Sequence, residues 1–162
     1  MANYDLLHST TLTVGSTNSL TIGSIAGTYR DLILVMYLQG TNSNRINGIV
    51  NSDSASDKYR MVSVENDGGT GLSDSTGTGT NAYFHAGVCT NNTWSVNTVN
   101  FMDYSSTVRQ KTFLSHEGVG TSRTGLRAMT WRNDDAITSI TVSTSAGNFD
   151  AGCTFKLFGI EA

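Results

Sequence analysis

Proline is completely absent from the 162 residues, and charged residues make up only 14% of them. Soluble domains usually contain about 5% proline and about 25% charged residues. Without proline, glycine and asparagine must form the turns. Alanine, leucine, glutamate and lysine, the strong helix formers, are also scarce, which argues against a mainly helical fold.

Basic runs are missing as well. The formal net charge is −3, and the lysines and arginines are scattered singly. This excludes the electrostatic footprint of a nucleic-acid-binding protein and gives no support for a charged membrane partner. The longest apolar run, Leu32–Leu38, is far shorter than the ~20 residues that span a bilayer. The residues Met1–Asp5 show no secretory signal, so we expect a protein made in a cytoplasm.

Clustered metal ligands are also lacking. The histidines His8, His85 and His116 are isolated from one another and from the two cysteines. The sequence therefore predicts no metal centre and no cofactor. Cys89 and Cys153 lie 64 residues apart. Because disulfides are rare in cytosolic proteins, we expect two buried, unpaired thiols.

Catalytic motifs are equally hard to find. No serine lies in a Gly-x-Ser-x-Gly elbow, and the 13 acidic residues are too scattered to show or exclude a carboxylate pair. Asn51–Asp57 spaces oxygen ligands along a loop but lacks the glycine and glutamate of a helix-loop-helix calcium site. Such strings also form turns, so a cation there stays open. We expect a protein that is not an enzyme.

What the chain does contain is serine, threonine, asparagine and glycine, with 19, 23, 14 and 17 copies. Stretches rich in threonine, valine, isoleucine and aromatics recur between clusters of these turn formers. They predict an all-β, antiparallel β-sandwich, jelly-roll-like, with about 8–11 short strands in one domain, 1–162. The expected strands are Tyr4–Val14, Ser19–Ile25, Asp31–Leu38, Arg45–Val50, Lys58–Glu65, Ala82–Cys89, Ser95–Tyr104, Gln110–Glu117, Gly125–Trp131, Ile137–Ser143 and Thr154–Ile160.

Two segments stand out within this pattern. Leu32–Met36 is continuously apolar, which predicts a central strand covered on both faces. Residues 67–80 are almost entirely glycine, serine, threonine and aspartate. A segment of this composition buries little apolar area, so we expect a flexible surface loop there.

Two groups of residues are candidates for contacts with other molecules. Trp94 and Trp131 could stack on a sugar ring or form a subunit contact, although tryptophan more often packs in a core or at a sheet edge. Leu6, Leu7 and Leu12 lie in the first strand region. A terminal segment stays disordered unless it is tied down, so these leucines could anchor a subunit contact. Alternatively, the region is simply a strand of the sandwich.

Several stretches together resemble a family of short, β-rich virion structural proteins of marine and freshwater phages, cyanophages included. The most specific is the closing pattern, a Gly-Asn-Phe turn followed by an apolar strand that ends in Phe-Gly-Ile. The matching stretches are Asn3–Leu7, Leu20–Ile25, Tyr29–Val35, Arg45–Ser54 with Tyr59, Trp131 with Ala136–Ile140, and Gly147–Ile160. The resemblance implies a head decoration or tail-associated subunit and supplies no catalytic residues.

From these observations we expect a non-enzymatic bacteriophage structural protein, displayed on the virion surface as a capsid decoration or cement protein or as a tail-associated subunit. The alternative is a carbohydrate- or receptor-binding module of a tail fibre or adhesin. Because shells and tails contain three-fold positions, the expected partners are further copies in a homotrimer and the major capsid or tail proteins. A host surface glycan is a further candidate. Assembly would take place in the cytoplasm of the host bacterium.

Overall fold

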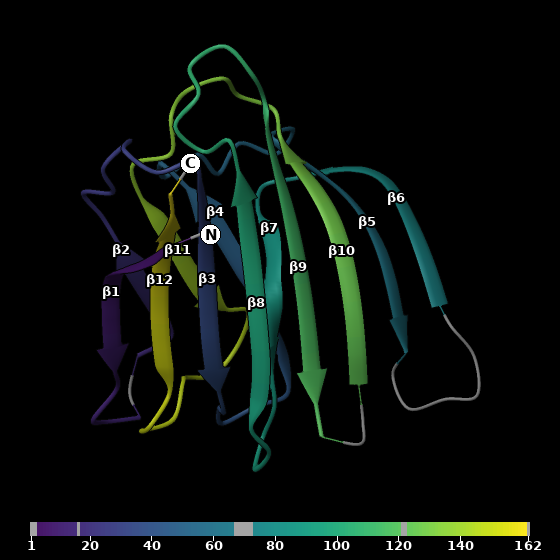
Figure 1. Ribbon diagram of the computed structural model, residues 1–162. Coiled ribbons are helices and arrows are strands. Elements are labelled where there is room, and N and C mark those ends of the chain that lie inside the picture. The colour runs from purple at the N-terminus through teal and green to yellow at the C-terminus, as the bar shows by residue number, and fades with distance from the viewer. Residues whose placement is uncertain (1–2, 16, 67–72, 121–122, 162) are drawn as a thin grey trace.

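The computed structural model describes residues 3–15, 17–66, 73–120 and 123–161, with the backbone alone for 73–80 (Figure 1). Twelve strands and no helix occur in this part of the chain, so it contains no helix that could cross a membrane. The strands are β1 (Tyr4–Thr11), β2 (Ser19–Ile22), β3 (Asp31–Leu38), β4 (Asn44–Val50), β5 (Tyr59–Asn66), β6 (Ser73–Asn81), β7 (Phe84–Cys89), β8 (Ser95–Met102), β9 (Lys111–Val119), β10 (Arg123–Trp131), β11 (Ile140–Thr144) and β12 (Thr154–Ile160).

The strands form two sheets that face each other. An eight-stranded sheet has the order β1-β12-β3-β8-β9-β10-β5-β6, and a four-stranded sheet has the order β2-β11-β4-β7. All the strand pairs in these two sheets are antiparallel. Figure 1 shows the small sheet as a second layer behind part of the large one. The expectation of an antiparallel, jelly-roll-like β-sandwich is thereby confirmed.

Strand β3 shows how the core is built. It lies between β12 and β8, so it is central in the large sheet. Leu34 and Met36 face the small sheet and are completely buried, whereas Val35 is half-buried and Tyr37 is 47% exposed. The expectation that Leu32–Met36 is covered on both faces is therefore wrong. The second sheet covers one side only, and the outer face of β3 is apolar without being enclosed.

Aromatic side chains fill the centre of the sandwich. Phe84 of β7 packs against Tyr59, Phe101 and Phe113 of the large sheet, with ring centroids 6.0, 5.7 and 5.1 Å away. On the other side of Phe84 lies Gly48, where a Cβ atom would come within 2.2 Å of the phenyl ring. The glycine in β4 thus makes the space that this ring occupies.

The serine- and threonine-rich segment contains a strand where we expected a loop. Residues 73–81 form β6, which pairs with β5 at the edge of the large sheet. The expectation of a loop over 67–80 is therefore wrong for 73–80, while 67–72 lie outside the described residues. Threonine favours extended backbone, and pairing with β5 gives hydrogen-bond partners to the main-chain groups of β6 that face β5, which requires no apolar side chain.

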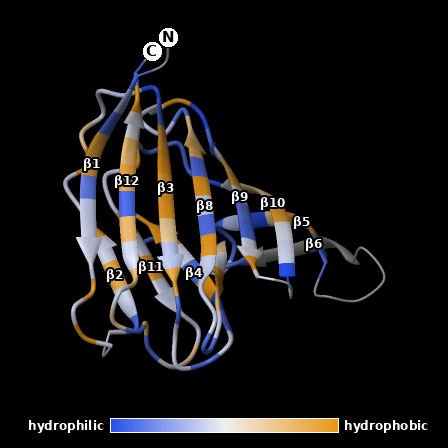
Figure 2. Ribbon diagram, turned by 60° about the horizontal axis from the view of Figure 1, so that its bottom comes forward, coloured by the Kyte–Doolittle hydropathy of each residue, from blue (hydrophilic) through white to orange (hydrophobic). Residues whose placement is uncertain are grey.

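The small sheet is narrower than the large one. Its edge strand β7 contacts β8, β9, β10 and β5. Beyond β7 the strands β10, β5 and β6 continue past the edge of the small sheet (Figures 1 and 2), while β10 and β5 still contact β7. Polar groups on the inner face of these strands can therefore meet side chains from the free edge of β7, and this is where the candidate site lies.

Candidate functional site

The strand register places charged side chains in a row on the inner face of the large sheet. Gly125 of β10 is paired with Glu117 of β9 on one side and with Glu65 of β5 on the other. Arg123 and Arg127 lie two positions before and after Gly125, so they point to the same face. Two carboxylates and two guanidinium groups are thus gathered around one glycine.

These four side chains form a closed ion cluster, which we call the Glu–Arg cluster. Arg127 places Nη2 2.5 Å from Glu65 Oε2 and Nη1 2.7 Å from Glu117 Oε2. Arg123 also binds both carboxylates, with its Nε 2.9 Å from Glu117 Oε1. Gly125 makes room for this arrangement, because a Cβ atom there would lie only 3.0 Å from Glu117 Oε1. The Glu117 side chain is fully buried and that of Arg127 is 2% exposed.

The protonation states around the Glu–Arg cluster follow from burial and charge. Burial raises the pKa of Glu65, but the charges of Arg123 and Arg127 outweigh it, so the pKa lies below its usual value. For His85 of β7, burial and then the charges of Arg127 and Arg45 lower the pKa to about 3. At neutral pH Glu65 is therefore ionised and His85 is neutral. A general acid needs the opposite, a carboxyl group whose pKa is raised.

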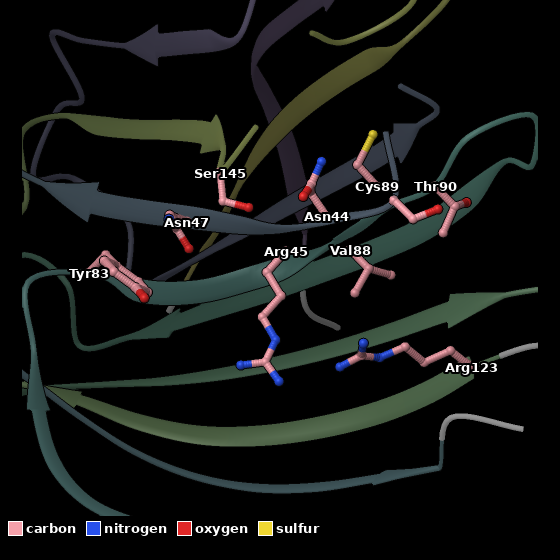
Figure 3. Close-up of a pocket in the computed structure, with 10 residues that line it drawn as sticks. Asn44, Arg45, Asn47, Tyr83, Val88, Cys89, Thr90, Arg123 and Ser145 are labelled. Atoms are coloured by element: carbon pink, nitrogen blue, oxygen red, sulfur yellow. The ribbon is translucent and has the colours of Figure 1, made fainter. Parts of the chain in front are cut away.

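A cavity of about 360 Å³ lies beside this cluster, between β4, β7 and the start of β10 (Figure 3). Arg45 of β4 and Arg123 both extend into it, and Arg45 Nη2 lies 3.6 Å from Glu65 Oε1. None of the described residues that line it is acidic. Most of the lining side chains are polar and uncharged or arginine; the chief ones are Asn44, Arg45, Asn47, Tyr83, Arg123 and Ser145.

One thiol also reaches this cavity. Cys89 at the end of β7 lines it, although the residue is buried and only 1% exposed. Burial, together with the neighbouring Cys153 and Asp150, raises the pKa of Cys89 to about 12. Cys153 is buried too, and its Sγ contacts the backbone of Gln39. Both cysteines are free thiols in the structure.

We expect both thiols to resist alkylation in the folded protein and to react once it unfolds. At pH 8 a pKa of about 12 leaves roughly one Cys89 in ten thousand as thiolate, the reactive form. Iodoacetamide without reductant should therefore modify neither cysteine rapidly in buffer and both in denaturant, as read by mass spectrometry. An unreduced, denatured chain with no modified cysteine would instead reveal a disulfide.

The two tryptophans do not meet and differ in exposure. Trp131, at the end of β10, is completely buried, and its indole Nε1 donates a hydrogen bond to Asp53 Oδ2 at 2.9 Å. The prediction that Trp131 contacts a sugar or another subunit is therefore wrong, because the ring is enclosed in the sandwich. Trp94 precedes β8, is 46% exposed and lies over the turn at Gly152. Contact of Trp94 with another molecule stays a prediction.

The three leucines of the first strand region also differ. Leu6 is 56% exposed, whereas Leu7 and Leu12 are partly buried and pack against the core. The region forms β1, the edge strand of the large sheet, with Leu12 just beyond its end. Two of the three leucines thus contribute to the sandwich itself. A subunit contact at Leu6 stays a prediction.

The oxygen-rich segment Asn51–Asp57 is occupied by internal hydrogen bonds. Asn51 Oδ1 accepts from the backbone N–H groups of Thr138 and Ser139, and Asp53 accepts from Trp131. These oxygens bind the turn to the rest of the fold. Within the described ranges, no group of three or more His, Cys, Asp or Glu side chains could hold a metal ion.

Reasoning from the sequence missed the Glu–Arg cluster, although a signal for it was present. Glu117 and Arg127 lie in the same alternating phase as the core residues Phe113 and Met129 of their own strands. A charged residue in phase with the core must face inward and needs a buried partner. Which strands would bring those partners together depended on the sheet order, and the sequence does not show that order.

Comparisons with known proteins concern the fold alone. No protein-family model matches the chain, and no curated protein is similar to it in sequence. An exo-inulinase from Aspergillus awamori has a similar arrangement, with 12% identity and a TM-score of 0.49 over 99% of this chain and 30% of that one. The chain thus spans less than a third of that enzyme. The galectin LEC-6 from Caenorhabditis elegans is 8% identical, with a TM-score of 0.39 over 95% of this chain and 96% of that one. Likenesses this weak transfer no function.

Proposed function

We propose that this protein is a non-enzymatic subunit on the outside of a bacteriophage particle, and that its cavity binds a saccharide of the host surface. The cavity beside β7 supports this proposal most directly. It is open to solvent and lined by groups that make directed hydrogen bonds, which is typical of sites for polar ligands. The sequence resemblance to phage virion proteins supports the location on a particle.

The lining of the cavity suits the hydroxyl groups of a sugar. Asn44 and Asn47 offer amide groups, and Ser145 offers a hydroxyl group. Tyr83, whose ring centroid lies 5.9 Å from that of His85, adds an aromatic surface. Aromatic rings pack against the apolar faces of sugar rings, while amides and hydroxyls bind their hydroxyl groups.

The electrostatics support a binding role over catalysis. The two carboxylates near the cavity, Glu65 and Glu117, are each held by Arg123 and Arg127. A glycosidase needs one carboxyl group that donates a proton and a second that acts as base or nucleophile. Carboxylates neutralised by the same two arginines are poorly prepared for either task.

A second candidate, a capsid decoration or cement subunit, is favoured by the outer face of the large sheet. Val62, Val64 and Leu126 are 51%, 44% and 55% exposed. Leu126 is paired with Val64, and Val62 lies on the same face of β5, so the three form an exposed apolar patch. Such a patch suits packing against another virion protein, including further copies in the expected homotrimer.

The proposal is tested with particles and with the isolated protein. Proteomics and cryo-microscopy of purified virions should find this chain in multiple copies on the particle surface. Fluorescently labelled protein should bind host cells, and periodate oxidation of their surface sugars should abolish the binding. Light scattering should report a trimer. A protein that is absent from intact virions and is found as free monomer in the lysate would refute the virion role. If the protein still binds cells after periodate oxidation, its ligand on the host surface is not a saccharide.

A further inference from the structure

The cavity carries an unbalanced positive charge. Among the described side chains, three cations, Arg45, Arg123 and Arg127, meet two anions, Glu65 and Glu117, which leaves one positive charge in excess. Within the Glu–Arg cluster each arginine binds both glutamates, so those four side chains neutralise one another. Arg45 is the charge that remains, in a chain whose overall formal charge is −3.

Arg45 makes only a long, exposed ion pair within the protein. Its guanidinium group approaches Glu65 Oε1 only to 3.6 Å, whereas Arg127 lies 2.5 Å from Glu65 Oε2. The side chain of Arg45 is 52% exposed, and exposed ion pairs contribute little free energy. A ligand that bound Arg45 would therefore displace almost no internal interaction.

A second guanidinium group lies beside it. Arg45 and Arg123 come from different strands and approach the same carboxylate, that of Glu65. Figure 3 shows the two groups extending toward each other at the cavity. Neighbouring His85 is neutral, and none of the described residues that line the cavity is acidic. The negative charge beside the two guanidinium groups is that of Glu65, which Arg123 and Arg127 already hold in the Glu–Arg cluster.

We propose that the ligand of this cavity is an acidic saccharide whose carboxylate or sulfate group lies between Arg45 and Arg123. Guanidinium groups are planar and donate parallel hydrogen bonds that match the two oxygens of such groups. The neutral side chains Asn44, Asn47 and Tyr83 would then hold the rest of the sugar ring. This inference rests on the proposed saccharide binding and narrows it to one chemical class.

The test uses calorimetric titration of the full chain with matched ligands. They are a short oligomer of galacturonate, the same oligomer with its carboxyl groups methyl-esterified, and a sulfated galactan oligomer. We expect an acidic oligomer to bind, and for galacturonate we expect the ester to bind at least roughly tenfold more weakly, since a hydrogen bond to a charged group is lost. Binding of galacturonate alone identifies a carboxylate site, and binding of the sulfated oligomer alone identifies a sulfate site.

Two variants assign the binding to Arg45. Arg45→Gln should weaken binding of the acidic oligomer roughly tenfold or more, because the charged donor is lost. The matched control is Arg60→Gln, which removes the same charge from an exposed position on the outer face of β5 and should bind like the unaltered protein. A parallel titration with inorganic sulfate, read by NMR at the arginine Nε–H signals, should shift those of Arg45 and Arg123.

Each other outcome overturns a defined part of the proposal. An ester that binds as tightly as the acid, or an Arg45→Gln variant that binds as well as Arg60→Gln, refutes the anion site while saccharide binding stands. If sulfate shifts the arginine signals but no saccharide binds, the proposal of saccharide binding is wrong and the proposal of an anion site stands. If no saccharide binds and sulfate shifts no arginine signal, both proposals are wrong.

Discussion

Arg127→Met should lower the free energy of unfolding by about 3–5 kcal/mol, the cost of breaking a buried ion pair. Arg127 is 2% exposed and holds Glu65 and Glu117 together, and the Glu117 side chain is fully buried. Methionine fills similar space, but it leaves the buried carboxylate of Glu117 to the partly exposed Arg123, and it leaves Glu65 to Arg123 and the more distant Arg45. Unfolding in urea, followed by tryptophan fluorescence, measures the loss.

Two further variants separate this effect from general damage. Arg60→Met makes the same substitution on the exposed face of β5 and should change stability by less than about 0.5 kcal/mol. The double variant Arg127→Met, Glu117→Leu removes one charge of each sign and leaves Glu65 paired with Arg123. It should recover most of the loss, because replacing a whole buried pair is nearly neutral. A single variant as stable as the unaltered protein, or a double variant less stable than the single, would contradict this account of the Glu–Arg cluster.

Phe84→Ala should lower the free energy of unfolding by about 3–5 kcal/mol, as expected for an aromatic ring removed from a closed core. Phe84 is 1% exposed and contacts the rings of Tyr59, Phe101 and Phe113. It is the aromatic side chain that the small sheet contributes to this group, so its loss leaves a cavity between the two layers. The same urea titration measures the effect.

The neighbour of Phe84 supplies the control for this prediction. Gly48→Ala should destabilise the protein by about 1–3 kcal/mol, because its Cβ would overlap the phenyl ring. In the double variant with Phe84→Ala, the added methyl group occupies part of the vacated space. The loss of stability of the double variant should therefore be smaller than the sum of the losses of the two single variants. Tyr37→Ala removes a half-exposed ring from the outer face and should cost far less than Phe84→Ala. Strict additivity of the glycine and phenylalanine variants would show that the ring and the glycine do not compete for space.

Local patterns were sufficient to identify most strands. The ends of β3 and β12 coincide with the predicted segments Asp31–Leu38 and Thr154–Ile160. Strand β6 was missed because 73–80 contains no apolar residues. Its extended backbone depends on hydrogen bonds to β5, a partner that local composition does not reveal.

The candidate site was much harder to derive. Arg45, Glu65, Glu117 and Arg123 belong to four different strands, and each looks like an ordinary polar residue in its own segment. The two tryptophans attracted attention by their chemistry, yet Trp131 proved to be a buried core residue. Residue type alone did not separate binding residues from packing residues, because exposure depends on which sheet covers which face.

The sequence by itself determined that the chain is all-β, that its strands alternate between two faces, and that charge is scarce. These properties follow from local propensity and from the two-residue period of a strand. Only the tertiary structure decided that β5, β9 and β10 lie side by side, that Gly125 separates Glu65 from Glu117, and that Arg45 reaches them from the other sheet. The physical reason is that strand order and sheet packing arise from contacts between distant segments, and the free energy of those contacts is not encoded in any one segment.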